Sequence, residues 1–77
     1  MRDLVDTLTQ RQREVFALLA QGKSNPEIAK ELGVSAHTVR IHISAILRAL
    51  GVSNRTQAAV MAASHHTEAQ PGSFSRP

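Results

Sequence analysis

Apolar residues recur along this chain at the three-to-four-residue spacing of amphipathic helices, in four successive segments. The clearest stripe lies in the third segment and consists of Val39, Ile43, Ile46, Leu47 and Leu50. No period-two run flanked by a hairpin turn is present, so the pattern predicts no strands. We therefore predict an all-α fold with helices over about residues 10–21, 25–32, 35–50 and 54–64.

Capping residues mark where these helices begin and end. Thr9 with Gln12, and Asn54 with Gln57, have the spacing of a capping box, in which side chains satisfy backbone amides at the helix start. Ser35 is positioned to cap the third helix. Each of the first three helices is followed by a glycine, the residue that best adopts the left-handed conformation of a helix end: Gly22, Gly33 and Gly51.

The start of the second helix has two possible caps. Ser24 can cap it, with Glu27 completing a capping box, or Asn25 can cap it, with Pro26 at the first helical position. Because proline disfavours a helical conformation in the residue before it, we favour Asn25 as the cap.

The join between the second and third helices is the segment Leu32-Gly33-Val34-Ser35. A turn this tight that contains glycine is typical of a helix-turn-helix motif. The pattern thus predicts a four-helix helix-turn-helix bundle over residues 6–64. Helical periodicity is lost from residue 65, so we expect residues 65–77 to form a disordered tail.

Composition excludes several classes of protein. A chain of 77 residues forms one domain at most, and without cysteine it has neither disulfides nor thiolate metal sites. Its longest apolar run, residues 58–63, is far shorter than the ~20 residues that span a bilayer. Neither a carboxylate pair, a Ser/His/Asp constellation nor a glycine-rich phosphate loop is present. We expect a cytoplasmic binding module that is not an enzyme, touches no membrane and holds no metal or cofactor.

The positive charge is concentrated in one part of the chain. Nine Lys/Arg against six Asp/Glu give a net charge of +3. Acids and bases balance within residues 1–31 and within residues 68–77, whereas residues 32–67 hold three arginines and no acid. This distribution indicates an anionic partner for the third helix and its surroundings.

Opposite its apolar stripe, the third helix carries five residues that we call the outward row: His37, Arg40, Ile41, Ser44 and Arg48. Arginine can bridge O6 and N7 of guanine, an apolar side chain can contact the thymine methyl, and serine can bond several base edges. An exposed isoleucine between polar residues suits such a contact better than it suits water. We therefore expect DNA base contacts from Arg40, Ile41, Ser44 and His37.

Contacts to the DNA backbone are expected near helix starts, where amides and the helix dipole attract phosphate. The helix before a recognition helix crosses the backbone in such motifs. We expect phosphate contacts from Lys23, Ser24, Asn25, Ser35, Thr38, Arg48 and Arg55. For Ser35 capping accompanies any such contact, for Thr38 the alternative is a local backbone bond, and for Arg48 and Arg55 an ion pair is equally open.

The sequence resembles the DNA-binding domain of the LuxR/FixJ/NarL type over about residues 6–64. The matching positions are Leu8-Thr9, Arg13-Glu14-Val15, Leu18-Leu19-Ala20, Gly22, Ser24-Asn25, Glu27-Ile28-Ala29, Leu32, Val34-Ser35, Thr38-Val39-Arg40, His42, Ile46, Leu50-Gly51-Val52, Arg55 and Ala58-Ala59. Three positions depart from the family's pattern: Ser44 stands where Lys or Arg is frequent, Pro26 where Lys is frequent, and Gln12 where Glu is usual.

The resemblance implies a function and several partners. It implies a bacterial transcriptional regulator whose third helix enters the major groove of double-stranded DNA, with Arg40, Ile41 and Ser44 at base-facing positions. It also implies homodimerisation through the fourth helix, an N-terminal receiver or ligand-binding domain in a longer parent chain, and RNA polymerase as a partner.

The outward positions of the fourth helix predict a small dimer face, formed by Thr56, Val60 and Ala63. Ala58, Met61 and Ala62 are expected to face the bundle instead. So small a face buries less than a standard stable interface, so we expect a monomer that dimerises on an inverted repeat in DNA.

Two alternative functions remain open. Residues 13–50 also resemble region 4 of bacterial sigma factors, although that region would end before a fourth helix. A module of another class, which binds an acidic protein partner through the outward row, would use the same charges. Salt-dependent binding to random-sequence duplex distinguishes DNA binding from a protein-only module.

Overall fold

The computed structural model describes residues 4–69, and the side chains of residues 4–64. A 3-10 helix η1 (Leu4–Thr7) precedes four α-helices, and the described residues form no strand. The helices are α1 (Gln10–Ala20), α2 (Asn25–Leu32), α3 (Ala36–Leu50) and α4 (Arg55–Ala69). The predicted all-α helix-turn-helix fold is confirmed.

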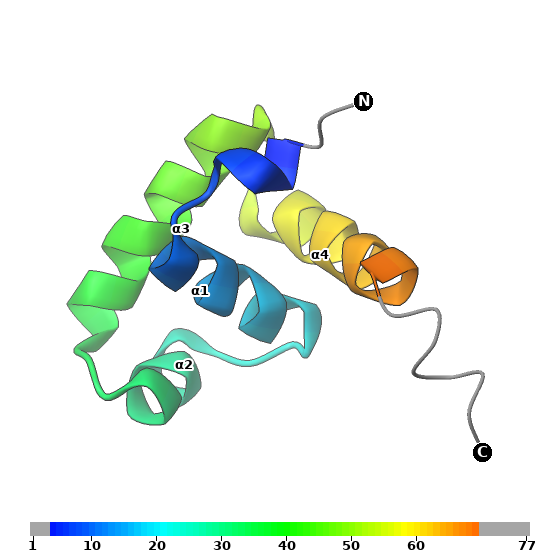
Figure 1. Ribbon diagram of the computed structural model, residues 1–77. Coiled ribbons are helices and arrows are strands. Elements are labelled where there is room, and N and C mark those ends of the chain that lie inside the picture. The colour runs from blue at the N-terminus through cyan, green and yellow to red at the C-terminus, as the bar shows by residue number, and fades with distance from the viewer. Residues whose placement is uncertain (1–3, 70–77) are drawn as a thin grey trace, which may run out of the picture.

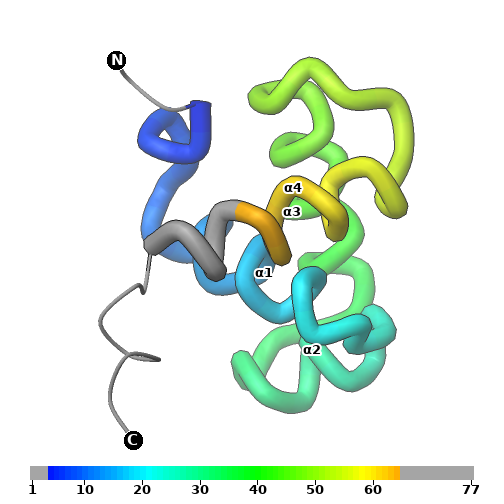
Figure 2. The backbone as a smooth tube through the Cα atoms, turned by 90° about the vertical axis from the view of Figure 1, so that its right-hand side faces the viewer, coloured from blue at the N-terminus to red at the C-terminus, as the bar shows by residue number. Residues whose placement is uncertain are grey.

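Helix α1 is the centre of the arrangement. It packs against α3 on one side and, most extensively, against α4 on the other (Figure 1). Helix α2 packs mainly against α3, which forms the two-helix unit of the motif. In two views at right angles, η1 and α2 lie at opposite ends of the molecule (Figures 1 and 2).

One apolar core joins all of these elements. The largest side chains that are almost fully buried are Leu19, Ile28, Ile46, Val15 and Val39. Burying each of them stabilises the fold by about 1.5–3 kcal/mol relative to exposure. The predicted stripe of α3 forms its share of this core, although Leu47 is only partly buried.

The N-terminal segment also belongs to the core, which the pattern analysis missed. Val5 and Leu8 are 4% and 3% exposed, and η1 packs against α3. A single 3-10 turn is too short to show a periodic signal in the sequence. The residues that build the core therefore begin at Val5, just before the predicted start of the domain.

The turn of the helix-turn-helix depends on Gly33. Its φ of 72° is left-handed, a conformation that side chains other than glycine's rarely adopt. This lets the Val34 amide donate to the Ala29 carbonyl at 3.0 Å and closes the end of α2. Val34 is then partly buried against the core beneath the turn.

The cap favoured for α2 was wrong. Ser24 is the cap: its hydroxyl accepts from the Glu27 amide at 3.3 Å, and its amide donates to Glu27 Oε1 at 2.8 Å. Asn25 is the first helical residue, and Pro26 the second. Two reciprocal bonds outweigh the conformational preference of a residue before proline, and the Asn25 side chain is bound elsewhere.

Both ends of α4 differ in detail from the prediction. Asn54 Oδ1 accepts from the Gln57 amide at 2.9 Å, but the Gln57 side chain accepts from the amide and hydroxyl of Ser53 rather than completing a capping box. The predicted end near residue 64 was also wrong, because the helix continues to Ala69, so the tail expected from residue 65 begins as helix. The segment contains neither glycine nor proline before Pro71, so nothing in it stops the helix at residue 64. The rest of that expected tail, residues 70–77, lies outside the described residues.

Candidate nucleic-acid interface

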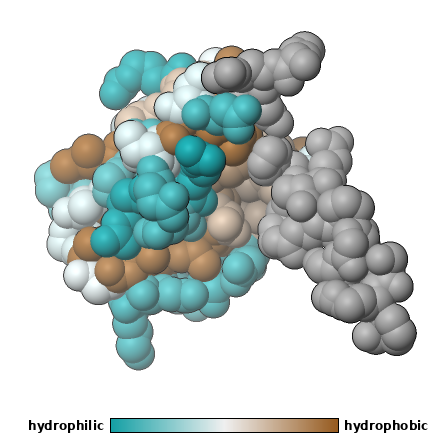
Figure 3. Space-filling model, viewed as in Figure 1, coloured by the Kyte–Doolittle hydropathy of each residue, from teal (hydrophilic) through white to brown (hydrophobic). Residues whose placement is uncertain are grey.

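The outward row of α3 lies on the surface, as predicted. Its five members are all exposed, and Ile41 retains 56% of its surface. The helix periodicity that buries Val39, Ile43 and Ile46 necessarily turns this row away from the core. On the face shown in Figure 3, hydrophobic and hydrophilic residues alternate along the left edge, where α3 lies.

The two arginines of the row carry uncompensated charge. Within the described part of the chain, neither Arg40 nor Arg48 forms an ion pair. They are eight positions apart in the sequence, which places them about 12 Å apart along the helix axis. One side of α3 therefore presents two available guanidinium groups with Ile41 and Ser44 between them.

The start of α3 offers donors to an anion. Ser35 caps the helix, since its hydroxyl accepts from the Thr38 amide at 3.0 Å, and it also donates to the Thr38 hydroxyl at 3.0 Å. The Thr38 hydroxyl hydrogen remains available for an outside acceptor. The amides of Ala36 and His37, in the first turn, have no acceptor among the described residues.

The start of α2 is more occupied. Lys23 lies 3.7 Å from Glu31, and the Ser24 amide and hydroxyl are used in the capping box. Pro26 has no N–H to give. Among the residues predicted to hold phosphate here, Asn25 is the one whose backbone N–H has no acceptor in the described residues.

Arg55 is bound within the protein. Its guanidinium donates through one nitrogen to Asn25 Oδ1 and through the other to the Lys23 carbonyl at 2.7 Å. The ion pair considered for Arg55 is absent from the described residues, and two hydrogen bonds stand in its place. Arg55 and the Asn25 side chain therefore hold the start of α4 against the start of α2.

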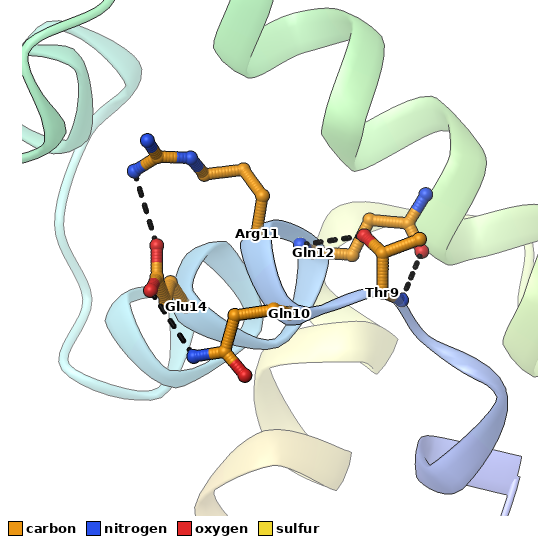
Figure 4. A network of polar contacts seen from close by, with 5 residues as sticks. All are labelled: Thr9, Gln10, Arg11, Gln12 and Glu14. Atoms are coloured by element: carbon orange, nitrogen blue, oxygen red, sulfur yellow. Dashed lines mark hydrogen bonds and ion pairs between the residues drawn. The ribbon is translucent and has the colours of Figure 1, made fainter.

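Arg11 and Glu14 of α1 compensate each other locally. Arg11 Nη1 lies 3.0 Å from Glu14 Oε1, and Gln10 donates to the other oxygen of the same carboxylate at 3.2 Å (Figure 4). The same view shows the predicted capping box of Thr9 and Gln12, which is confirmed. Among the described residues, Arg13 of α1 and Lys30 of α2 are also exposed without an ion pair, so α3 is distinguished by two such arginines on a helix without acids.

Hydrogen bonds at the start of α2 lower the pKa of the Glu27 carboxyl. The Ser24 amide donates to its carboxylate and, with the Ser24 side chain, holds the pKa of Glu27 below its ordinary value. Lys23 lowers the pKa further. At neutral pH Glu27 is therefore an anion that completes the cap of α2.

The outward face of α4 is small and apolar at its centre. Val60 is 65% exposed to solvent, and Thr56 and Ala63 are also exposed. Ala58 and Ala62 are buried and Met61 is partly buried, as predicted for the inward face.

Among residues 4–64, whose side chains the structure describes, no three His, Cys, Asp or Glu residues are grouped so as to hold a metal ion. His42 is half-buried, and its ring has no hydrogen-bond partner within residues 4–64. None of the helices described is long and apolar enough to cross a membrane.

Comparison with known families supports the motif that the geometry shows. The model of the family described as bacterial regulatory proteins, luxR family, matches residues 6–62. The chain belongs to this family. As a luxR-family helix-turn-helix domain, it falls within DNA-binding transcription regulation.

Individual relatives cover this luxR-family domain to different extents. The transcriptional regulatory protein LiaR of Bacillus subtilis is 49% identical over 61 residues, which are 79% of this chain and 29% of LiaR. The response regulator protein VraR of Staphylococcus aureus is 42% identical over 83% of this chain and 31% of VraR. The spore germination protein GerE of Bacillus subtilis is 57% identical over 69% of this chain and 72% of GerE. The chain thus spans less than a third of LiaR and VraR.

Proposed function

We propose that this luxR-family domain binds double-stranded DNA sequence-specifically, with α3 as the recognition helix in the major groove. The observation that carries the proposal is the outward row: an exposed isoleucine lies between two arginines without ion pairs, on a helix without acids. A solvated helix face normally mixes acids with bases, and it seldom carries a large apolar side chain that is 56% exposed, as Ile41 is. A major groove accommodates such a helix.

In this arrangement the outward row reads bases. Arg40 forms two hydrogen bonds with guanine, and Ile41 contacts a neighbouring thymine methyl. Ser44 and His37 bond base edges one turn to either side of this pair. Short side chains at 41 and 44 allow the helix to approach the groove floor closely.

The DNA backbone is held at the starts of α2 and α3. At α3, the Thr38 hydroxyl and the amides of the first turn bind phosphate while Ser35 keeps its cap. Arg48 binds phosphate further along α3. At α2, Lys23, Ser24 and the Asn25 amide lie beside the backbone, whereas Arg55 contributes through its bonds inside the protein.

Full affinity requires a dimer on DNA. Of the four cationic residues proposed to meet DNA, Lys23 and Arg55 are engaged within the protein, which leaves Arg40 and Arg48. A second copy packs against Thr56, Val60 and Ala63 of α4, and the pair reads an inverted repeat with half-sites about one helical turn apart. The small face makes the dimer dependent on DNA.

The domain works within a larger regulator. LiaR is named a transcriptional regulatory protein and VraR a response regulator, and the chain spans less than a third of each. This supports an N-terminal receiver or ligand-binding domain in the parent chain and RNA polymerase as its partner. The extensive packing of α4 on α1 argues against a sigma region 4, which would end at the recognition helix.

A titration with duplex DNA tests the proposal. Binding to a duplex selected from a random pool should exceed binding to random duplex, and both should weaken with salt, with a slope of about −2 to −3 per domain for two or three phosphate contacts. In an NMR titration the amides of residues 35–48 should shift most. Shifts concentrated in α1 would contradict the recognition helix, and the absence of any duplex binding would favour the protein-interaction module.

A further inference from the structure

Arg55 connects two segments that are far apart in the sequence. Its hydrogen bonds to Asn25 and to the Lys23 carbonyl span 30 and 32 positions, whereas the capping bonds span three or four. Arg55 is also partly buried, so water competes less for these bonds than at an exposed site. We call this pair of bonds the Arg55 clasp.

The clasp acts where packing is thin. Helix α2 has eight residues and is fastened to the bundle mainly by Ile28 and Ala29, on the side that faces α3. Between the end of α1, the following loop and the start of α4 lies an open hollow whose walls include Leu19, Gly22, Thr56 and Ala59. Because no side chain fills this space, the start of α2 is held to α4 by hydrogen bonds rather than by apolar contact.

We infer that Arg55 is a positioning residue for DNA binding, which sets the place of the α2 start relative to α4 through Asn25 and Lys23. The inference rests on the proposed function. The planar guanidinium bonds two acceptors at once, one on a side chain and one on the backbone, and thereby fixes the orientation as well as the distance. A lysine at this position keeps the charge and loses the two-pronged geometry.

The clasp links the two proposed contact surfaces. Thr56, the neighbour of Arg55, belongs to the proposed dimer face, and Lys23 and Asn25 belong to the proposed backbone contact. When α4 meets a second copy, the clasp keeps each α2 start in line with the phosphates of its half-site. The side chain of Asn25 therefore binds Arg55 within the protein, while its backbone N–H faces the DNA phosphates.

A double-mutant cycle tests this inference. The variants are Arg55→Lys, Arg55→Gln, Asn25→Ala and the double variant of Arg55→Lys with Asn25→Ala. Arg13→Lys is the matched control, at an exposed arginine of α1 that has no ion pair in the described residues and no proposed contact with DNA. Dissociation constants are measured on a half-site duplex selected by the wild type, over a range of salt. Thermal unfolding of each variant establishes that it is folded at the temperature of the binding measurement.

Each single variant should weaken half-site binding about three- to tenfold, a typical effect for one hydrogen bond. The double variant should bind no worse than the weaker single variant, because both changes break the same clasp. The salt slope of Arg55→Lys and Asn25→Ala should stay that of the wild type, and Arg13→Lys should change binding by less than about twofold, since Arg13 lies outside the proposed interface.

Four outcomes overturn the inference. If the affinity losses of the two single variants multiply in the double variant, and Arg55→Gln reduces the salt slope by about one, Arg55 is a direct phosphate ligand. Unchanged affinity with a lowered melting temperature makes the clasp purely structural. Wild-type protein that binds no duplex refutes the proposed function and the clasp together, whereas wild-type binding with unaffected variants refutes the clasp alone.

Discussion

The Ser35 hydroxyl makes two hydrogen bonds with Thr38, as acceptor from its amide and as donor to its hydroxyl, both at 3.0 Å. The first bond caps α3. The second uses the only hydrogen of the Ser35 hydroxyl, so the Thr38 hydroxyl accepts and keeps its own hydrogen for another acceptor. The cap of the helix and a hydroxyl donor available to an outside acceptor are thus built from the same pair of residues.

Thr38→Val should separate these two roles. Valine has nearly the same shape and keeps the amide that Ser35 caps, so the fold is retained. Losing one hydrogen bond to a charged phosphate costs about 1.5 kcal/mol, or roughly tenfold in affinity, on every duplex sequence. Fluorescence anisotropy with selected and random duplexes measures this loss. As a control, Ser35→Ala should lower the free energy of unfolding by about 1 kcal/mol; a Thr38→Val loss limited to one sequence would contradict the phosphate role.

Arg40→Ala should weaken binding to the selected duplex by about 1–3 kcal/mol, the worth of a bidentate contact to guanine. It should also relax the choice of base at one position, because other base pairs no longer leave an arginine unpaired. Binding to a panel of single-base variants of the duplex measures both effects. Equal losses on all sequences would make Arg40 a phosphate contact instead.

Ile41 can be tested from both sides of the interface. Replacing each thymine of the selected duplex by uracil removes one methyl group at a time, and at one position this should cost about 0.8 kcal/mol, or roughly fourfold in affinity. Ile41→Ala should lower affinity for the thymine duplex and be insensitive to uracil there. Since Ile41 is 56% exposed, the free energy of unfolding of Ile41→Ala should differ little from that of the wild type. Wild-type protein indifferent to uracil at every position would contradict the methyl contact.

Val60→Asp tests the dimer face of α4. Val60 is 65% exposed, so the isolated domain should fold with a change in stability within about 0.5 kcal/mol. Two aspartates meeting across a two-fold axis repel, so binding to the full inverted repeat should fall about tenfold or more while binding to a half-site is unchanged. Band-shift titrations on both duplexes compare the two. An identical effect on both would refute dimerisation through α4.

The capping box of α2 should make stability depend on pH. The bond from the Ser24 amide lowers the pKa of Glu27 in the folded chain, so folding is favoured while the carboxylate is ionised. This contribution is complete above the ordinary glutamate pKa of about 4.3 and is lost as pH falls through the lower pKa of the folded state. Glu27→Gln keeps the acceptor without titrating. Urea unfolding should therefore show the two proteins converging in acid, and parallel pH profiles would exclude a role for Glu27.

Residues within four positions of one another account for most of what was predicted correctly. The stripe from Val39 to Leu50, the cap at Ser35 and the box of Thr9 with Gln12 are all local, because helix periodicity and capping depend on the next turn only. The same periodicity predicted that Arg40 and Ile41 would be exposed, since a buried face implies the opposite one.

Contacts between distant segments could not be predicted in this way. Val5 enters the core because α3 provides the surface that a single 3-10 turn needs. The choice between Ser24 and Asn25 as the cap of α2 looked local, but the Asn25 side chain is bound by Arg55, which lies thirty positions further along the chain. For Arg55, the sequence left a phosphate contact and an ion pair equally open. Only the packed bundle, which brings the start of α4 beside the start of α2, turns it into a clasp, because a hydrogen bond depends on where two groups lie in space and not on how far apart they are in sequence.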